Sequence, residues 1–388
     1  MFEYALSLFP FGGLPWILAG YSQSGYGPVL QIADVTGIYG VSFLILASGT
    51  ALVWLVCSRG SRKAAWAPVL AAVLLTGGAL AYGRRSLEKW NAVPAAFRVA
   101  MLQGNISADD PESAVAAMFR TGYVRMADTL QPGEADLLVL PESPSPASFE
   151  VDDAYRRTFE ALSGRYAFGL IYNGIRYEET PQGSEYFNSA VFLGRGGAPT
   201  AVYDKIHLVP FGEYIPLARI LSFAETITRD AGHFSPGRDI RVADLGGHPA
   251  NAVICFEAVF PDLVRRFVRK GSRLIVNLTN DAWYGDSAAP YQHLAIARVR
   301  AVENRRYLLR ATNSGISAIV EPSGRIQTAT GLFREDVCRG SFGFVEAQTF
   351  YTRYGDVFVF LCAIIAFACW LMAECRRAAF RKRQLPEG

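Results

Sequence analysis

The stretch ANAVICFEAVFPDLVRRFVRKG, residues 250–271, holds the local pattern on which the fold assignment depends. It begins with a β-rich apolar run that ends at Cys255, and it continues into a helical pattern over residues 261–270. Pro261 occupies the first helical position and Gly271 follows the last, as is usual at helix ends. A buried strand followed closely by a helix predicts one unit of an α/β domain.

The same alternation of β-rich runs and helical patterns extends over residues 95–346, with a second helix predicted at residues 111–130. The chain of 388 residues is long enough for one large domain of this kind plus further segments. We therefore expect an α/β domain built around buried sheets. Its predicted strands are residues 98–103, 135–140, 168–172, 190–192, 250–255 and 273–278.

Three apolar runs without charged residues lie outside this region, at residues 35–57, 65–82 and 357–373. Each is roughly 17 to 23 residues long, which suits a helix that crosses a bilayer. A buried core helix is the alternative for the two shorter runs. Because 51% of the residues are hydrophobic, slightly above the usual globular share, we predict three transmembrane helices.

Basic residues beside these runs predict the orientation of the chain. Arg59, Arg62 and Lys63 connect the first two runs, and the tail at residues 374–388 is also basic. Such segments usually face the cytoplasm. Since one span separates the tail from residues 95–346, the α/β domain is predicted to be extracytoplasmic.

Residues 1–34 precede the first span, and residues 9–23 within them (FPFGGLPWILAGYSQ) are apolar and aromatic. Prolines and paired glycines interrupt this stretch, so it cannot form a straight spanning helix. We predict an interfacial arm with Trp16 and Tyr21 at headgroup depth, and an ordinary apolar loop is the alternative. No basic segment precedes a single short apolar stretch, so a cleavable signal peptide is not predicted.

Composition also argues against two classes of function. The formal net charge is +3, and the basic residues gather beside apolar runs, so nucleic acid is not an expected partner. The six cysteines lack the paired spacing of a disulfide framework or a metal site. The histidines lack the i, i+4 pairing of a zinc hydrolase, so neither a metal nor another cofactor is expected. They are His207, His233, His248 and His293.

Three polar residues each end or follow a β-rich run: Glu142 closes ADLLVLPE, Lys205 follows TAVYD, and Cys255 closes ANAVIC. Reacting groups converge at the carboxyl ends of strands in open α/β folds. A nucleophilic thiol needs a base or a nearby cation, and an attacked acyl carbonyl needs a cation for its oxyanion. The pattern thus predicts Cys255 as nucleophile, Glu142 as general base and Lys205 as cationic partner. Taken singly, the three residues fit a core thiol, a helix cap and a surface ion pair.

Four ordered motifs resemble the apolipoprotein N-acyltransferases, a family of the nitrilase superfamily. They are LPESP around Glu142, YDKIHLVPFGEYIP around Lys205, ICFE around Cys255, and NLTNDAWYGDSAAPYQHLAIARVRAVENRRYLLRATNSG at residues 277–315. The resemblance implies a nitrilase-type α-β-β-α sandwich flanked by transmembrane helices, in the bacterial inner membrane with the domain in the periplasm. The family typically carries more spans than three, so its first several helices are expected to be absent from this sequence.

The resemblance also assigns residues to roles. The family's catalytic glutamate, lysine and cysteine fall on Glu142, Lys205 and Cys255, two supporting glutamates fall on Glu213 and Glu257, and Phe256 stands where relatives often have tyrosine. Glu213 is expected to hold the Lys205 ammonium, and Glu257 the backbone around the nucleophile. Structural ion pairs are the alternative for both glutamates.

The implied activity is acyl transfer in two halves. Cys255 would take an acyl chain from a phospholipid as a thioester, and the α-amine of a diacylglyceryl-cysteine at an apolipoprotein N-terminus would then accept it. The implied partners are the phospholipid donor, the diacylated acceptor and membrane lipid. Two other functions stay open: a membrane-tethered nitrilase-type amidase, and a catalytically impaired fragment that only binds lipid or lipoprotein.

A further apolar segment follows the lysine motif, YIPLARILSFAETIT at residues 214–228. Its side chains Leu217, Leu221 and Phe223 predict a lipid-facing lid over an acyl channel. An amphipathic helix packed on its own domain is the alternative.

Overall fold

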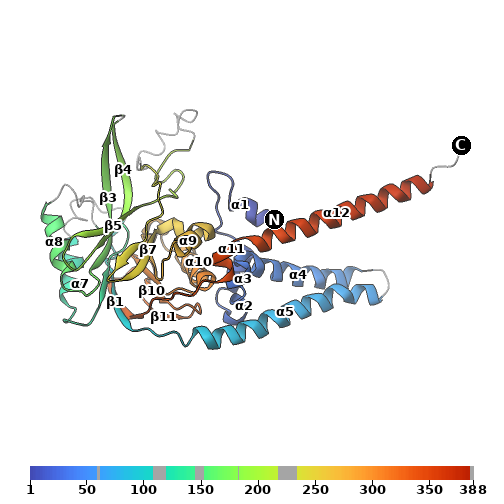
Figure 1. Cartoon of the computed structure of the whole chain (residues 1–388), viewed down its shortest axis with the longest axis horizontal. Helices are drawn as coiled ribbons and strands as arrows, with labels where there is room; N and C mark the ends of the chain where they lie inside the picture. Colours follow the sequence, from blue (N-terminus) through green and yellow to red (C-terminus); the bar gives the residue numbers. More distant parts are fainter. Residues whose placement is uncertain (59–61, 108–118, 145–152, 182, 217–233, 385–388) are drawn as a thin grey trace.

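The computed structural model describes residues 1–58, 62–107, 119–144, 153–181, 183–216 and 234–384, and two facing β-sheets form its centre (Figure 1). The first sheet has the order β12-β1-β2-β3-β4-β5 and the second β11-β10-β9-β8-β7-β6. The first sheet's strands are β1 Phe97–Gln103, β2 Leu137–Val139, β3 Leu170–Thr180, β4 Gly183–Leu193, β5 Pro199–Asp204 and β12 Asp336–Phe342. The second sheet's are β6 Ala243–Leu245, β7 His248–Ile254, β8 Ile275–Thr279, β9 Leu308–Thr312, β10 Ala318–Val320 and β11 Ile326–Ala329.

Alternation along the strands separates two apolar cores. Val99 and Met101 of β1 lie in the core shared with the second sheet, whereas Ala100 and Leu102 face α7 (Val124–Asp128) and α8 (Asp153–Ser163). Successive strand side chains point to opposite faces, so one apolar run fills both layers. Figure 1 shows α9 (Pro261–Arg269) and α10 (Ala289–Asn304) on the outer side of the second sheet. The predicted α-β-β-α sandwich is confirmed.

The centre of each sheet is parallel, since β1 pairs parallel with β2 and β2 with β3, and β7 pairs parallel with β8 and β8 with β9. The carboxyl ends of β2 and β7 therefore carry the residues that follow them to one edge of each sheet. The remaining pairs within the described ranges are antiparallel.

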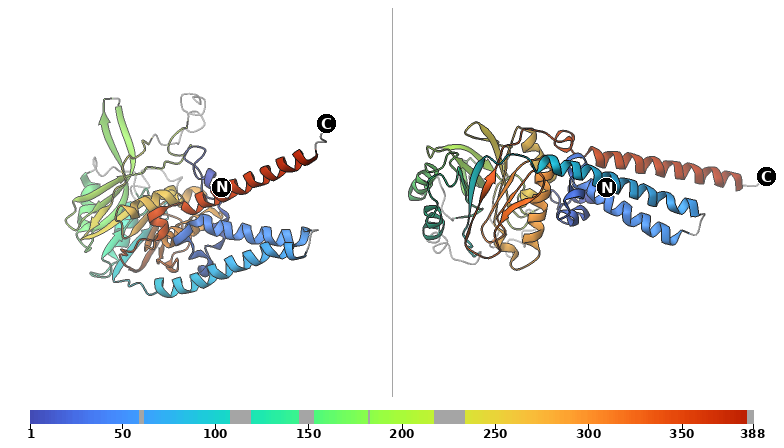
Figure 2. Two further views of the ribbon diagram at one scale, coloured as in Figure 1. Left: turned by 45° about the vertical axis from the view of Figure 1, so that its right-hand side comes forward. Right: turned by 90° about the horizontal axis from the view of Figure 1, so that it is seen from below.

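Three long helices leave the domain in one direction: α4 (Ile38–Cys57), α5 (Arg62–Trp90) and α12 (Val357–Gln384) (Figures 1 and 2). Each contains a stretch long and apolar enough to cross a membrane, at Ile38–Cys57, Trp66–Trp90 and Val357–Ala378. Most of each stretch is exposed on the protein, and a surface of apolar side chains on this scale fits contact with lipid.

The helix bounds differ from the apolar runs predicted as spans at residues 35–57, 65–82 and 357–373. Val35 and Thr36 belong to the separate turn α3 (Ala33–Thr36), because Gly37 adopts φ 64° and breaks the helix. A Cβ at Gly37 would lie 2.6 Å from the Tyr351 ring, so glycine is required there. Helix α5 continues to Trp90 and α12 to Gln384, because the basic, alanine and glutamate residues beyond the apolar runs favour helix. The basic tail at residues 374–388 is thus helical in its described part.

The N-terminal segment is a series of short turns at the base of these helices, and it contacts the domain. Its elements are α1 (Phe2–Leu6), a 3₁₀ turn (Ala19–Gln23), α2 (Gly27–Leu30) and α3. The Trp16 indole N–H donates to Gln292 (2.7 Å), and the buried Tyr21 hydroxyl accepts from Arg300 (3.2 Å). Both polar tips thus find partners in the domain, and the headgroup depth of Trp16 and Tyr21 stays a prediction. The short helix α11 (Phe350–Tyr354) leads into α12.

Candidate active site

Glu142, Lys205 and Cys255 lie together between the two sheets. Glu142 follows β2, Lys205 follows β5, and Cys255 is the first residue after β7. All three are buried, with 6%, 1% and 7% of their surface exposed. The Lys205 ammonium lies 3.4 Å from Glu142 Oε1, and the Cys255 thiol lies within electrostatic range of both groups. The tertiary fold thus joins residues that are far apart in the sequence into one cluster.

Glu142 and Lys205 are held by further polar groups. The backbone N–H of Asn280 donates to Glu142 Oε2 (3.0 Å). The side-chain Nδ2 of Asn188 donates to Glu142 Oε1 (3.0 Å) and to Glu213 Oε1 (2.9 Å). Lys205 Nζ donates to Glu213 Oε1 at 2.9 Å, the contact expected for Glu213. One cation therefore lies between two carboxylates, and a single amide fixes the positions of both.

The ammonium of Lys205 stays charged in this site. Burial lowers its pKa, but the carboxylates of Glu142 and Glu213 outweigh burial and raise the pKa above its ordinary value. Lys205 is therefore a permanent positive charge, suited to stabilising an anion and unsuited to proton transfer at neutral pH.

Cys255 occupies a strained turn. Its φ of 47° lies in the left-handed region, which is uncommon for a residue with a side chain. Burial raises the pKa of the thiol and Glu142 raises it further, while Lys205 and a hydrogen bond from Thr279 lower it. The raised pKa keeps the thiol protonated at neutral pH, so a reaction at Cys255 would require a base that takes the proton as the new bond forms.

Glu257 ties the turn that holds Cys255 to the segment that follows Lys205. Its Oε2 accepts from the backbone N–H of Ile254 (2.8 Å), and its Oε1 accepts from Ile206 N–H (2.7 Å), His207 N–H (3.1 Å) and the Tyr203 hydroxyl (2.6 Å). Glu257 is fully buried, and burial raises its pKa. One carboxylate therefore bridges the end of β7, next to Cys255, to the segment after β5, next to Lys205.

Sequence reasoning missed a second layer of polar residues behind Cys255. His293 Nε2 lies 3.2 Å from the Cys255 carbonyl oxygen, and its Nδ1 lies 3.0 Å from Asp281 Oδ1. Burial raises the pKa of Asp281, but Arg310 at 2.7 Å and His293 hold it at about 2. The motif at residues 277–315 contained these residues, but their spacing fits no metal site, so only their packing reveals them.

The arm completes this layer. The Trp16 ring lies 5.2 Å from the His293 ring and 5.6 Å from that of Tyr284, between ring centroids. A residue of the N-terminal segment thus packs against the histidine that contacts the Cys255 carbonyl. Phe256 is buried beside Cys255 and makes an edge-to-face contact with Phe260 at 5.0 Å.

Two other expectations concern the surroundings of the cluster. The lid residues Leu217, Leu221 and Phe223 lie outside the described residues. Among the residues that are described, no group of three or more metal-ligating side chains occurs.

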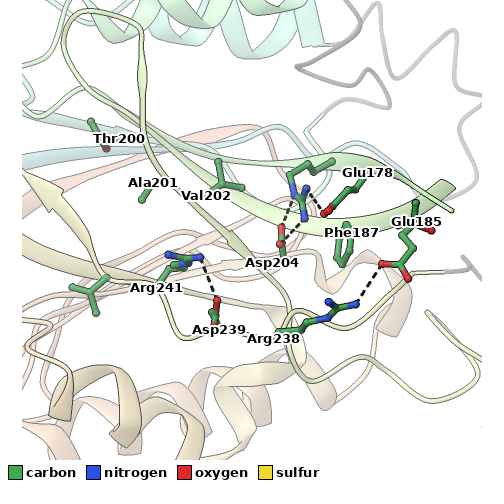
Figure 3. A pocket seen from close by; sticks show the side chains of 13 residues that line it. Glu178, Glu185, Phe187, Thr200, Ala201, Val202, Asp204, Arg238, Asp239 and Arg241 are labelled. Atoms are coloured by element: carbon green, nitrogen blue, oxygen red, sulfur yellow. Dashed lines mark hydrogen bonds and ion pairs between the residues drawn. The ribbon is translucent and has the colours of Figure 1, made fainter. Parts of the chain in front are cut away.

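A separate pocket of about 600 Å³ lies beside β3, β4 and β5 (Figure 3). Its charged side chains form ion pairs with one another: Arg176 with Asp204 at 2.8 Å, Arg241 with Asp239 at 3.3 Å, and Arg238 with Glu185 at 3.9 Å. The lining carries three arginines and four carboxylates, and the cysteine, glutamate and lysine cluster does not line it. We assign no reaction to it.

Two facing sheets around a buried cysteine, glutamate and lysine define a protein of the nitrilase superfamily. Residues 98–348 match the carbon-nitrogen hydrolase family, and residues 1–51 match the apolipoprotein N-acyltransferase N-terminal domain. The chain belongs to the apolipoprotein N-acyltransferase family, as the resemblance of its motifs indicated. Membership of this family makes it an acyltransferase.

Relatives of known name support this assignment over nearly the whole chain. The apolipoprotein N-acyltransferase of Geobacter metallireducens is 40% identical, with 96% of this chain and 71% of the relative aligned. That of Methylococcus capsulatus is 34% identical, over 97% and 73%. Among solved structures, Saccharomyces cerevisiae Nit3 of the nitrilase superfamily is 22% identical over 63% of this chain and 89% of its own, with a TM-score of 0.48.

Proposed function

We propose that the chain transfers an acyl chain from a phospholipid to the N-terminal α-amine of the diacylglyceryl-cysteine of an apolipoprotein, through a thioester on Cys255. The observation that carries this proposal is a buried cysteine, glutamate and lysine cluster in a domain joined to three helices of membrane-spanning character. The names of the relatives support the acceptor. The helices favour a lipid ester over a small soluble amide as the donor.

In the first half-reaction Cys255 attacks the ester carbonyl at the sn-1 position while Glu142 takes the thiol proton. A carbon–sulfur bond forms, and the carbonyl oxygen becomes an oxyanion that Lys205 stabilises. The oxyanion collapses, the carbon–oxygen ester bond breaks, and Glu142 returns the proton to the departing lysophospholipid oxygen. The products are an acyl thioester and a lysophospholipid.

In the second half-reaction the α-amine of the acceptor attacks the thioester carbonyl. Glu142 accepts a proton from the amine and passes it to the sulfur of Cys255 as the carbon–sulfur bond breaks. An amide forms and the thiol is restored. Lys205 stabilises the same oxyanion position in both halves, which explains the value of a cation that stays charged throughout.

We place the three helices in the bacterial inner membrane with the domain in the periplasm. Basic residues at the far end of the helices, Arg376 and Arg377 among them, support this orientation because such segments usually stay in the cytoplasm. The lid proposed at Leu217, Leu221 and Phe223 follows the lysine motif in the sequence and would contact the lipid donor. Serine at Leu221 and Phe223 should then weaken phospholipid use without loss of folding.

Mass spectrometry of the intact chain incubated with phospholipid tests the proposal. We expect a mass increase of one acyl group, located on Cys255 after digestion and absent in Cys255→Ser. Cys338→Ser is the matched control, because Cys338 is also a buried thiol but lies on β12. An unmodified Cys255 in the parent chain would overturn the proposal, and hydrolysis of soluble amides without an adduct from lipid would favour an amidase.

A further inference from the structure

One face of α5 changes from apolar to basic as it approaches the domain. Leu75, Gly78, Tyr82, Arg85 and Lys89 follow one another at spacings of three and four residues, so they form one continuous stripe. Helix α5 meets the domain at its C-terminal end, where Arg85 and Lys89 lie (Figure 1). The stripe therefore runs from the apolar interior of the span to the level at which headgroups would lie.

The apolar half of the stripe lines a groove of about 300 Å³ between α3, α4, α5 and α12. Phe43 of α4, Leu75 and Gly78 of α5, and Phe358 of α12 are among its walls. A Cβ at Gly78 would have no heavy atom within 4 Å, so the absence of a side chain keeps this wall open. The groove faces the region where lipid acyl chains would lie.

The basic half of the stripe lines an adjoining pocket of about 450 Å³, which contains Arg85, Lys89 and Trp90. Val35 and Tyr82 line both this pocket and the apolar groove, so the two spaces are adjacent. A groove of apolar walls thus lies next to a pocket with two cations.

These cations are available to a ligand. The one carboxylate among the residues of the pocket, Asp34, is already bound by Arg305 Nη2 at 2.6 Å and by the Tyr82 hydroxyl at 2.8 Å. Over the ranges that the structure describes, Arg85 and Lys89 form no ion pair with any carboxylate. Lys89 lies 4.7 Å from the ring centroid of Trp90, which leaves its ammonium without an anionic partner.

We propose that this combined space is a binding site for a phospholipid, with one acyl chain in the apolar groove and the phosphate at Arg85 and Lys89. Apolar walls match a hydrocarbon chain, and two unpaired cations match an anionic headgroup. Tyr82 lines both spaces and Trp90 lies beside Lys89 in the basic pocket, as aromatic residues do at a membrane interface. The site goes beyond the proposed acyl transfer, which it does not require.

The site is separate from the nucleophile. Near its N-terminus, helix α10 contacts the Cys255 carbonyl through His293. Its last residue is Asn304, and the next residue, Arg305, binds Asp34 of the basic pocket. His293 and Asn304 are about 16 Å apart at the rise of an α-helix. A lipid held at Arg85 and Lys89 is therefore a second lipid, distinct from one that reacts at Cys255.

Native mass spectrometry of the full chain in detergent, titrated with palmitoyl-oleoyl-phosphatidylglycerol, tests this site. The charge-reversed variant Arg85→Glu with Lys89→Glu should retain the lipid at least about tenfold more weakly, given the attraction of each basic residue for anionic lipid. Arg84→Glu is the matched control, because Arg84 is exposed and lines neither space. Equal loss in the control, or no loss in the double variant, would overturn the proposal.

A second pair of variants tests the apolar groove. Gly78→Leu should fill it and weaken lipid retention, whereas Gly77→Leu should not, because Gly77 also has open space around a Cβ but does not line the groove. Diacylglycerol lacks the phosphate, so Gly78→Leu should retain it more weakly than the parent does. The charge-reversed variant should retain diacylglycerol as well as the parent does. Unchanged retention of both lipids in Gly78→Leu would refute the groove as the chain-binding part.

The acyl adduct on Cys255 is measured in the same samples. We expect all of these variants to form it as the parent does, since they leave the reactive cluster intact. If the parent chain retains lipid but forms no adduct on Cys255, the proposed reaction is contradicted and the lipid-binding site is still supported. Parent chain that forms the adduct but retains no second lipid would overturn the site alone.

Discussion

Replacement of Glu257 by glutamine should slow the acylation of Cys255 while leaving every proposed reacting group in place. The carboxylate accepts four hydrogen bonds, three of them at Oε1 and one, from Ile254 N–H, at Oε2. A glutamine keeps the Oε1 acceptor but places an N–H₂ donor against the Ile254 N–H. The residue before the nucleophile would then lose the contact that positions it.

The magnitude follows from these contacts. Each bond at Oε1 weakens by about 1 kcal/mol when its acceptor becomes neutral, and the unpaired Ile254 N–H costs about 2 kcal/mol more. Burial destabilises the charged carboxylate, as the raised pKa of Glu257 shows. The neutral amide of glutamine avoids this cost, which offsets part of the weakened hydrogen bonding. We expect a net effect of about 3 kcal/mol, which is about a 100-fold lower acylation rate if it acts on the barrier.

The assay is the rate of acyl-adduct formation on Cys255, followed by intact-mass measurement, beside the thermal unfolding midpoint. Tyr203→Phe is the matched control, because it removes one of the four donors and keeps the carboxylate. We expect about a fivefold slower rate for it, as for the loss of one hydrogen bond. A Glu257→Gln rate equal to that of Tyr203→Phe would refute the reasoning, and a lower midpoint with an unchanged rate would assign Glu257 to stability alone.

Three further results are expected. Lys205→Met should abolish the adduct and lower the unfolding midpoint, because it leaves the carboxylates of Glu142 and Glu213 buried without their cation, at a cost of about 3 to 5 kcal/mol. Asp281, whose pKa is lowered to about 2, should contribute about 2 kcal/mol to the free energy of unfolding at neutral pH. This contribution is lost as the pH falls from about 4 to 2. The free energies of unfolding of the parent and of Asp281→Asn, measured by acid titration, should therefore converge over that range. The exposed Cys57, at the far end of α4, should react with a membrane-impermeant maleimide in inverted vesicles and stay protected in intact cells; the reverse pattern would contradict a periplasmic domain.

Much of the architecture was predictable because local patterns encode it. The strand predicted at residues 98–103 lies within β1, and the helix at residues 261–270 corresponds to α9 with Pro261 at its start. Alternating and helical periodicities reflect burial of one face, which is a property of neighbouring residues. Strands β3 and β4 extend well beyond their predicted ranges, because their outer halves form an exposed hairpin of polar residues without an apolar signal.

The helix ends and the arm were less predictable. Apolar composition marks where lipid would begin, but the helices continue into charged residues whose propensity is equally helical, as in α5 to Trp90. Trp16 has the composition of an interfacial residue, yet it packs against His293. Whether an aromatic ring meets lipid or protein depends on what lies opposite it, and that partner is 277 positions away in the chain.

The sequence by itself determined the chemical groups of this protein and the helices that carry them toward a membrane. Cys255, Glu142 and Lys205 stand at the ends of strands, and strand ends are visible in a local pattern. Only the tertiary structure decided that Asn188 would hold two carboxylates, that Glu257 would join β7 to the segment after β5, and that His293 would lie behind Cys255. Those contacts depend on distances of about 3 Å between residues far apart in the chain, which packing of the two sheets sets and local periodicity does not.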